Sequence, residues 1–529
     1  MAPISRLSLL SLLSLATAEL TKVSTPVNVL AAEALLAEAA PVAASPSVTA
    51  TCKDLEKAVP GQVQYSTGPL YAQETKNYWS AALWEEKPFC ILFPKEPEHV
   101  ASAVKVLNTH KGVKFAVKSG GHDPNPGHAT ARDSVLISML LMNGTTYDPA
   151  KKVAYVKPGG TWNDVIGVLD KQGVTVVGGR LGPVGLGGYL VQGGLSFLSA
   201  QYGMAADNVL NFETVMANGS IVNINAQTDR DLLIAMRGSG NQFGIVTKFT
   251  IQTHPIGKVW GGYKIYLGSS NNKAVFAGLH DFIANNKDPK AAVIVNTNQM
   301  IGMSVYMVFY FYDGPTPPKG TFGKLEDIKA TLDMCKSRTY ADLLQFNGQG
   351  VAGLGQRTSF RSVTLPFLPG HADWYGEIEK TWWDITASFV KSHLTGGATI
   401  AFQPFTKAIA SASEKRGGNT MGLKASDPHR FILEINFLWG NKTDDQLIWS
   451  MGKQLTDKIA AQVKGFNGAK YVNTAGVAAA QSYTPYFMND ASDDQPVTGS
   501  YRDGARFAAL QKMHDPQGLW KRVGGFKYD

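Results

Sequence analysis

Three glycine-rich segments lie between residues 118 and 244, and each borders residues that favour β-strands. Glycine has no Cβ and tolerates positive φ, so such segments let backbone N–H groups come close to a ligand. A single segment could be only a loop. Three in one region, each with an entropic cost on folding, indicate a site for an extended dinucleotide with two phosphates and a ring system. The segments are residues 118–122 (KSGGH), 178–194 (GGRLGPVGLGGYLVQGG) and 237–244 (RGSGNQFG).

The first segment combines a cation and a histidine at one turn. It follows the apolar stretch 115–117, which is typical of a strand. Lys118 and the free backbone amides suit a diphosphate. His122, at the end of the turn, is a nucleophile within reach of a cofactor. Taken alone, a histidine after two glycines is more often an ordinary loop residue.

Composition narrows the classes of protein that this chain can belong to. A length of 529 residues predicts two to four domains, and 44% hydrophobic with 17% charged residues is ordinary for a globular protein. The net charge of +8 comes without a cluster of Lys and Arg interleaved with aromatics. We therefore expect a solvated basic surface and no nucleic-acid partner. No Cys/His spacing suggests a metal site.

The N-terminus predicts export. Residues 1–18 combine a basic residue, a Leu/Ser run and a small-residue cleavage pattern, as in a signal peptide. Residues 19–50 are rich in Ala, Pro, Ser and Val and predict a flexible leader. No other run approaches the length of a transmembrane helix. We expect a secreted protein or one in the endomembrane lumen.

Two further patterns agree with export. Cys52 and Cys90 flank the first structured segment and could pair in an oxidising compartment, which would leave Cys335 over. Three sequons are candidate glycosylation sites, although such triplets also arise by chance. They begin at Asn143, Asn218 and Asn441.

The pattern along the chain predicts an α+β fold. Residues 51–257 contain short β and α pieces punctuated by glycine, without the single GxGxxG that marks a nicotinamide-binding unit. Residues 258–475 contain longer strands with helices between them, which predicts an antiparallel sheet with helices on one face and a domain that varies with the substrate. The expected strands are 292–296, 303–312, 398–405 and 431–439, and the expected helices are 374–391 and 446–463.

Aromatic residues are concentrated in this second region. Alternation places Tyr306, Tyr310 and Tyr312 on one face of their strand. We expect most of the large aromatics to form the core and some to line a pocket. The other members of this set are Trp374, Trp382, Trp383, Phe402 and Trp439.

Glu434 is unusual because it lies in the middle of an otherwise apolar strand. Alternation puts it on one face with Asn436 and Leu438. A carboxylate in such a place is either paired, exposed at a rim, or facing a cavity. In a cavity, desolvation would raise its pKa toward the range that is useful for a base.

The motifs together resemble the fungal secreted, berberine-bridge-enzyme-like FAD-linked oxidases, which have a PCMH-type FAD-binding domain. The resemblance runs from Cys52 to the C-terminus. It rests on KSGGH, GGRLGPVGLGG, residues 202–209 (YGMAADNV), RGSGNQFGIVT, residues 489–491, Tyr501 and residues 514–516 (HDP). It implies a two-part FAD-binding domain with an inserted substrate domain and a C-terminal segment, 476–529, that closes the FAD domain.

The resemblance implies which residues bind FAD. His122 would bond covalently to the C8 methyl of the flavin. Many relatives add a second bond from a Cys in the second glycine segment, where this chain has Leu181, so a single attachment is expected. The implied FAD-binding residues are Lys118, Ser119, Gly120, Gly121, His122, Asp123, Gly182, Val184, Gly185, Gly187, Gly188, Gly193, Gly194, Asn208, Gly244, Ile245, Val246 and Asn489.

The chain departs from the family pattern at two places. Lys118 stands where an Arg is usual, which keeps the charge but loses bidentate phosphate geometry. Many relatives have Asn-Tyr-x-Asp near the C-terminus with the Tyr as acid/base, whereas residues 489–492 here are Asn-Asp-Ala-Ser. Asp490 could take that role, or it could belong to Glu434, because some relatives carry a Glu base on the corresponding strand.

The expected activity is the oxidation of a small molecule, a fungal secondary metabolite, by hydride transfer to FAD with oxygen as acceptor. Glu434 or Asp490 would remove the accompanying proton. Three alternatives remain open: a secreted carbohydrate oxidase, a flavin-dependent oxidative cyclase, and a silent flavin-binding protein without catalysis.

Overall fold

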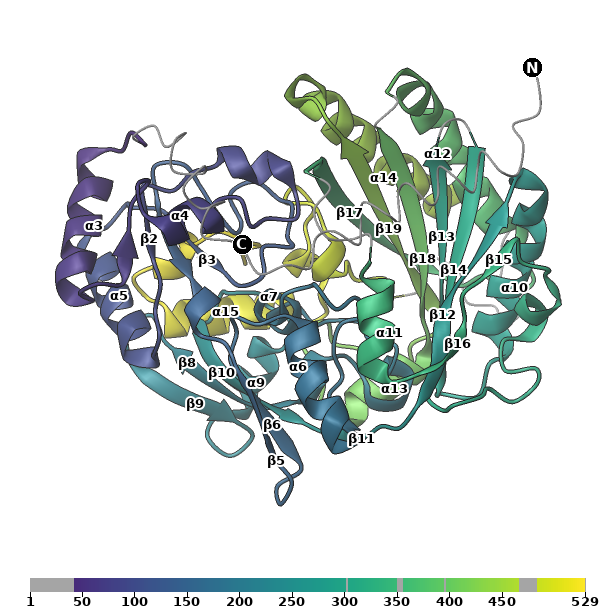
Figure 1. The fold of residues 1–529 in the computed structure, drawn as a ribbon, viewed down its shortest axis with the longest axis horizontal. Helices are drawn as coiled ribbons and strands as arrows, with labels where there is room; N and C mark the ends of the chain where they lie inside the picture. The colour runs from purple at the N-terminus through teal and green to yellow at the C-terminus, as the bar shows by residue number, and fades with distance from the viewer. Residues whose placement is uncertain (1–41, 301–302, 350–354, 394–395, 466–482, 529) are drawn as a thin grey trace.

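The computed structural model describes residues 42–300, 303–349, 355–393, 396–465 and 483–528. Figure 1 shows two lobes side by side. One lobe contains the N-terminal part of the chain together with its C-terminal end, and the other is built on one large fanned sheet. The predicted α+β fold is confirmed.

A helix begins at Pro46, within the segment that the sequence predicted to be a flexible leader. Residues 1–41, with the predicted signal peptide, lie outside the described residues. The expected leader, 19–50, is wrong for its last five residues, because helix α3 (Pro46–Ala58) begins there with a proline in its first turn. Its buried face packs on helix α5 (Pro97–Thr109). Cys52 of α3 forms a disulfide with Cys90.

A four-stranded sheet carries the first glycine segment. Its strand order is β1-β2-β4-β3, and β2, β4 and β3 run parallel because α5 crosses over between β2 and β3. Helix α4 (Pro69–Glu74) lies beside it. The strands are β1 (Val63–Gln64), β2 (Cys90–Leu92), β3 (Phe115–Lys118) and β4 (Val135–Ser138).

The third glycine segment leads into a strand of a five-stranded antiparallel sheet, and part of the second segment packs in the same hydrophobic core. The strand order of this sheet is β5-β6-β10-β8-β9, and helices α6, α7 and α9 share its hydrophobic core. The elements are β5 (Thr145–Asp148), β6 (Val153–Val156), α6 (Trp162–Leu169), α7 (Leu186–Val191), β8 (Val209–Val215), β9 (Ile221–Asn225), α9 (Arg230–Met236) and β10 (Ile245–Gln252).

The second lobe is built on an eight-stranded antiparallel sheet. Its order is β15-β12-β14-β13-β18-β19-β17, with β16 also paired to β12. The strands are β12 (Val259–Leu267), β13 (Ala291–Met300), β14 (Met303–Tyr312), β15 (Leu332–Asp333), β16 (Lys336–Arg338), β17 (Arg357–Pro366), β18 (Gly397–Phe405) and β19 (Arg430–Trp439).

The two faces of this sheet have different partners. Figure 1 shows helices α10 (Asn272–Asn285), α12 (Asp373–Ser392) and α14 (Asp445–Gly465) on the outer face. The opposite face meets the first lobe, where Phe311 stacks on Phe197 with ring centroids 5.0 Å apart. Residues on this inner face of β17 and β19 therefore point toward the glycine-rich loops.

The aromatic set faces away from the first lobe. Tyr306, Tyr310 and Tyr312 are buried in the core under the outer helices, together with Trp374, Trp382, Phe402 and Trp439, and Trp383 packs against that core. The expectation that some of this set line the pocket is wrong, because the tyrosine face of β14 is the face that the helices cover.

The C-terminal segment returns to the first lobe. After helix α15 (Gly504–His514), the guanidinium of Arg522 donates hydrogen bonds to the carbonyls of Leu107, His110 and Val113. The segment from residue 42 onward and the C-terminal segment therefore lie in the same lobe, and the large sheet is inserted between them in the sequence. Among the residues described, no helix is both long and apolar enough to cross a membrane.

Candidate active site

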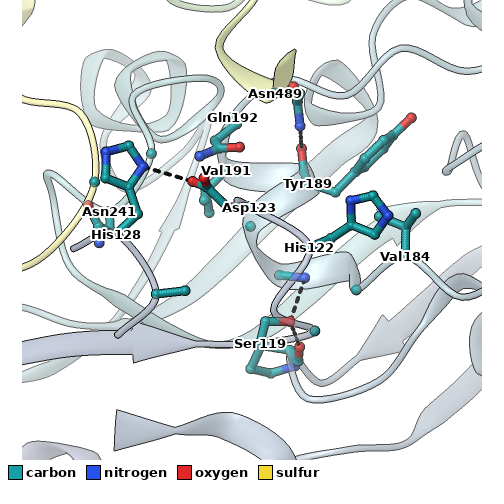
Figure 2. Close-up of a pocket in the computed structure, with 18 of the residues that line it drawn as sticks. Ser119, His122, Asp123, His128, Val184, Tyr189, Val191, Gln192, Asn241 and Asn489 are labelled. Atoms are coloured by element: carbon teal, nitrogen blue, oxygen red, sulfur yellow. Dashed lines mark hydrogen bonds and ion pairs between the residues drawn. The ribbon is translucent and has the colours of Figure 1, made fainter. Parts of the chain in front are cut away.

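A cavity lies where the glycine segments of the first lobe meet β17, β19 and the C-terminal segment of the chain. Figure 2 shows part of its wall, with His122 and Asp123 pointing in different directions from neighbouring positions. The following predicted site residues line it: Ser119, Gly120, Gly121, His122, Asp123, Val184, Gly185, Gly187, Gly188, Gly244, Ile245, Val246, Glu434, Asn489 and Asp490.

The first two glycine segments form a backbone cradle because they touch each other directly. A Cβ on Gly120 would collide with the backbone of Gly185. Ser119 Oγ donates to the carbonyl of Pro158 at 2.5 Å and accepts from the Gly187 N–H at 3.1 Å. Gly121 has φ +68°, a conformation that favours glycine. Such a cradle leaves backbone amides at the cavity wall, where they suit phosphate oxygens.

Apolar side chains line another part of the cavity. Ile245, Val246 and Phe249 come from β10, and Val117 and Met139 come from the first sheet and the turn after β4. A planar aromatic ring system is the kind of group that such a lining accommodates.

His122 is a buried imidazole with an unused nitrogen. Its ring stacks on Trp79, with centroids 4.4 Å apart and an interplanar angle of 12°. Within the described part of the chain, Nε2 has no hydrogen-bond partner. Burial lowers the pKa of His122 to about 4, so the ring is neutral and keeps a free lone pair at neutral pH. An unpaired, neutral nitrogen at the cavity wall fits a point of covalent attachment.

Glu434 and Asp490 form a carboxyl pair on the other side of the cavity. The Gln403 amide lies between them and donates to Asp490 Oδ2 at 2.9 Å and Glu434 Oε2 at 3.3 Å. Burial and the neighbouring Asp490 both raise the pKa of Glu434. Burial also raises the pKa of Asp490, against the opposing effect of Arg180. Each of the two groups therefore holds a proton more readily than an exposed carboxyl would.

Sequence reasoning missed three residues of the site. Arg180 donates to Gln403 Oε1 at 2.5 Å, which completes a chain from the guanidinium to both carboxyls. Phe360 of β17 lies 6.2 Å from the His122 ring. Arg180 is the charged residue of a glycine segment, and Gln403 is a polar residue in a mostly apolar strand. Each of these two patterns could have indicated a site residue.

Lys118 does not reach the cavity, so its predicted role at a phosphate is wrong. Its ammonium is fully buried in an ion pair with Glu74, 2.8 Å from Oε1. It also lies 4.4 Å from the centre of the Tyr78 ring. The charge is used inside the protein, beneath the Gly121 turn, and not on a ligand.

Four other predicted FAD-binding residues do not line the cavity either. A Cβ on Gly182 would collide with Asn163 of α6, so this glycine allows packing. The Asn208 amide donates to the carbonyls of Tyr202 and Met204 at 2.9 Å. Gly193 and Gly194 form a turn that Asn489 holds through a 3.0 Å hydrogen bond to the Gly194 N–H. These residues support the wall from behind.

Comparisons with known proteins agree with this site. Residues 88–225 match the family described as FAD binding domain. The chain is 34% identical over 467 residues to an uncharacterized FAD-linked oxidoreductase of Arthroderma benhamiae, covering 86% of this chain and 90% of that protein.

Two solved structures share the fold. Berberine bridge enzyme from Eschscholzia californica gives a TM-score of 0.71 at 15% identity, covering 90% of this chain and 99% of that one. Xylooligosaccharide oxidase from Myceliophthora thermophila C1 gives 0.70 at 18% identity, with the same two coverages.

The fold and the glycine-lined cavity define an FAD-binding redox protein. More narrowly, the chain belongs to the FAD-linked oxidoreductases, and it shares its fold with berberine bridge enzyme. The predicted family, the FAD cofactor and the oxidoreductase class are confirmed.

Proposed function

We propose that this oxidoreductase removes a hydride and a proton from a small organic substrate, with FAD held through one covalent bond to His122. The observation that carries the proposal is the placement of an unpaired imidazole and of two buried carboxyls, bridged by the Gln403 amide, around one cavity. When bound, FAD accepts the hydride, and we propose molecular oxygen as the final acceptor, which gives hydrogen peroxide.

A single attachment is supported by the residue at the second position. Leu181 lines the cavity where many relatives have a cysteine. The free cysteine among the described residues, Cys335, does not line it. His122 is therefore the proposed anchor, joined through a ring nitrogen to the C8 methyl carbon of the flavin.

The carboxyl pair supplies the base. With Arg180 beside it, Asp490 is the better candidate to stay ionised, while the pKa of Glu434 is raised by burial and by Asp490. Once Glu434 has released its own proton to solvent, its carboxylate takes up the substrate proton, and the Gln403 amide orients both carboxyl groups.

We propose a fungal secondary metabolite as the substrate class and export as the route. The Arthroderma relative is fungal. Similarity to the xylooligosaccharide oxidase, at 18% identity, supports the fold and not a sugar substrate. Exposed sequon residues and a disulfide agree with passage through a secretory compartment. The sequon residues are Asn143, Asn218 and Asn441.

A substrate screen on the purified holoprotein tests this function. Phenolic and polyketide-like compounds and oligosaccharides are added one by one, and peroxide release and anaerobic bleaching of the flavin are recorded. The proposal expects both signals with at least one phenolic or polyketide-like compound. Signals with oligosaccharides alone would refute the substrate class. A flavin that dithionite reduces but no compound bleaches would mark a silent flavin-binding protein.

A further inference from the structure

A buried histidine joins the flavin-attachment turn to the C-terminal segment. His128 Nδ1 lies 2.8 Å from Asp123 Oδ2, and His128 Nε2 lies 2.8 Å from Asp493 Oδ1. The His128 side chain is 5% exposed, whereas that of Asp493 is 65% exposed. Figure 2 shows Asp123 turned toward His128, away from the side on which His122 lies.

The geometry fixes the charge of the ring. Each carboxylate accepts a hydrogen bond, so an imidazole between two of them donates from both nitrogens and is an imidazolium. Burial alone would lower the pKa of His128, but Asp123 and Asp493 raise it to about 9. Lys527 interacts electrostatically with Asp493, and the Phe526 ring packs edge-on against His128 with ring centroids 4.9 Å apart.

Asn125 makes a second connection between the same two segments. Its amide nitrogen donates to the carbonyl of Ala491 at 2.9 Å, and its amide oxygen accepts from the Asp493 N–H at 3.0 Å. The same amide nitrogen also donates to Asp123 Oδ1 at 2.8 Å.

These bonds lie next to the two halves of the active site. Asp123 follows His122 directly, and Ala491 follows Asp490 directly. The proposed flavin anchor His122 and the segment that carries Asp490 are thus joined by the hydrogen bonds of Asn125 and His128.

We propose that His128 is a positioning residue, which as an imidazolium between Asp123 and Asp493 locks the segment carrying Asp490 onto the turn carrying His122. The catalytic part of this inference rests on the proposed function, while the locking part does not. No property of the substrate is needed for the lock to form.

The lock depends on pH in a definite direction. Because the pKa of His128 is higher in the folded protein than the ordinary value of 6.5, the bonds stabilise the fold fully below pH 6.5. That stabilisation is lost as the pH rises through about 9. A neutral ring keeps one donor and can hold only one of the two carboxylates.

Two substitutions of Asp493 distinguish the effect of the His128 bonds to Asp123 and Asp493, here called the lock, from an effect on general stability. Asp493→Ala removes one bond. Asp493→Asn keeps it in both protonation states, because the amide accepts from the imidazolium and donates to the neutral ring. Asp54→Ala is the matched control, since Asp54 pairs with His110 at 2.9 Å on the surface of α3.

The experiment measures cleavage of the C-terminal segment of the holoprotein by a broad-specificity protease, at pH 7 and pH 10. At pH 7, Asp493→Ala is expected to be cut about tenfold faster than wild type, as loss of one charged hydrogen bond implies. Asp493→Asn and Asp54→Ala should match wild type. At pH 10, wild type should approach Asp493→Ala, and Asp493→Asn should stay protected.

Equal cleavage of Asp493→Ala and Asp54→Ala at pH 7 would overturn the lock. Equal sensitivity of wild type and Asp493→Asn at pH 10 would overturn the role of the imidazolium. Covalent flavin content and the pH profile of kcat, measured on the same variants, report the catalytic consequence. An inactive wild type would refute the proposed function and leave the proteolysis result standing as the test of the lock.

Discussion

At the scale of the residue, Glu434 shows how far alternation in a strand can be trusted. Its face was predicted from period two, and the structure places its neighbours Leu433 and Ile435 in the core on the opposite face. Its pairing with Asp490 was not predictable, because that contact depends on how a distant loop returns to the sheet.

Glu434→Gln should lower kcat by roughly 10²–10⁴-fold while flavin content stays unchanged, because it removes the base and keeps the shape. Glu379→Gln is the matched control: Glu379 is also a buried carboxyl, bonded to Tyr306 in the core away from the cavity. Steady-state kinetics of both variants make the comparison. Equal activity of Glu434→Gln and wild type would exclude Glu434 as the base.

The pH profile of wild-type activity also tests the assignment of Glu434 as the base. The base acts when ionised, and its pKa is raised above the ordinary glutamate value of 4.5. Activity should therefore rise with pH through a midpoint well above 4.5, and Glu434→Gln should lose this acid limb. If wild-type activity instead rose with a midpoint at the ordinary pKa of an exposed carboxyl, the buried Glu434 would not be the base.

Lys118 marks the limit of motif reasoning at this scale. A cation next to a glycine turn is a plausible phosphate ligand, but the partner that captures it, Glu74, lies 44 residues earlier in the chain. Nothing local in the sequence indicates that a helix end will deliver a buried carboxylate to that point.

At the scale of the element, periodicity located strands and helices well. The predicted strand 303–312 matches β14, and the predicted helix 374–391 differs from α12 by one residue at each end. These segments have long, clear periods set by burial on one face. The expectation that some residues of the tyrosine face of β14 line a pocket was wrong, because the side that this face meets depends on the packing of three helices.

The contact of β3 with α4 is an element-level test of stability. Lys118→Met leaves Glu74 buried without its counter-ion and should lower the free energy of unfolding by about 3–5 kcal/mol. Lys114→Met, an exposed lysine just before the same strand, should change it by less than about 0.5 kcal/mol. Denaturant melts of both variants give the values, and equal melts would show that the buried pair contributes no stability.

At the scale of the whole molecule, the site depends on contacts between segments that lie far apart in the sequence. The bond from Arg180 to Gln403 spans 223 residues of sequence, and the bond from Asn489 to Gly194 spans 295. Glycine segments could be recognised from sequence because they are local. Contacts between residues so far apart in the sequence could not be recognised in the same way, because they form only when the two lobes dock.

The Cys52–Cys90 disulfide should stabilise the first lobe. It closes a loop with a sequence separation of 38, so the double variant Cys52→Ser/Cys90→Ser should lose about 2–4 kcal/mol. Cys335→Ser, which changes the free cysteine in the other lobe, should melt like wild type. Thermal melts under non-reducing conditions make this comparison. A double variant as stable as wild type would show that the bridge does not hold the lobe.

The central claim is that His122 is the one covalent anchor of FAD, and peptide mass mapping of the native holoprotein tests it most directly. After denaturation and proteolysis, the flavin mass should appear on the peptide that contains His122 and on no other peptide. The His122→Ala variant should release its flavin completely in acid. An unmodified His122 peptide from wild type, with the flavin free or on another residue, would contradict the claim.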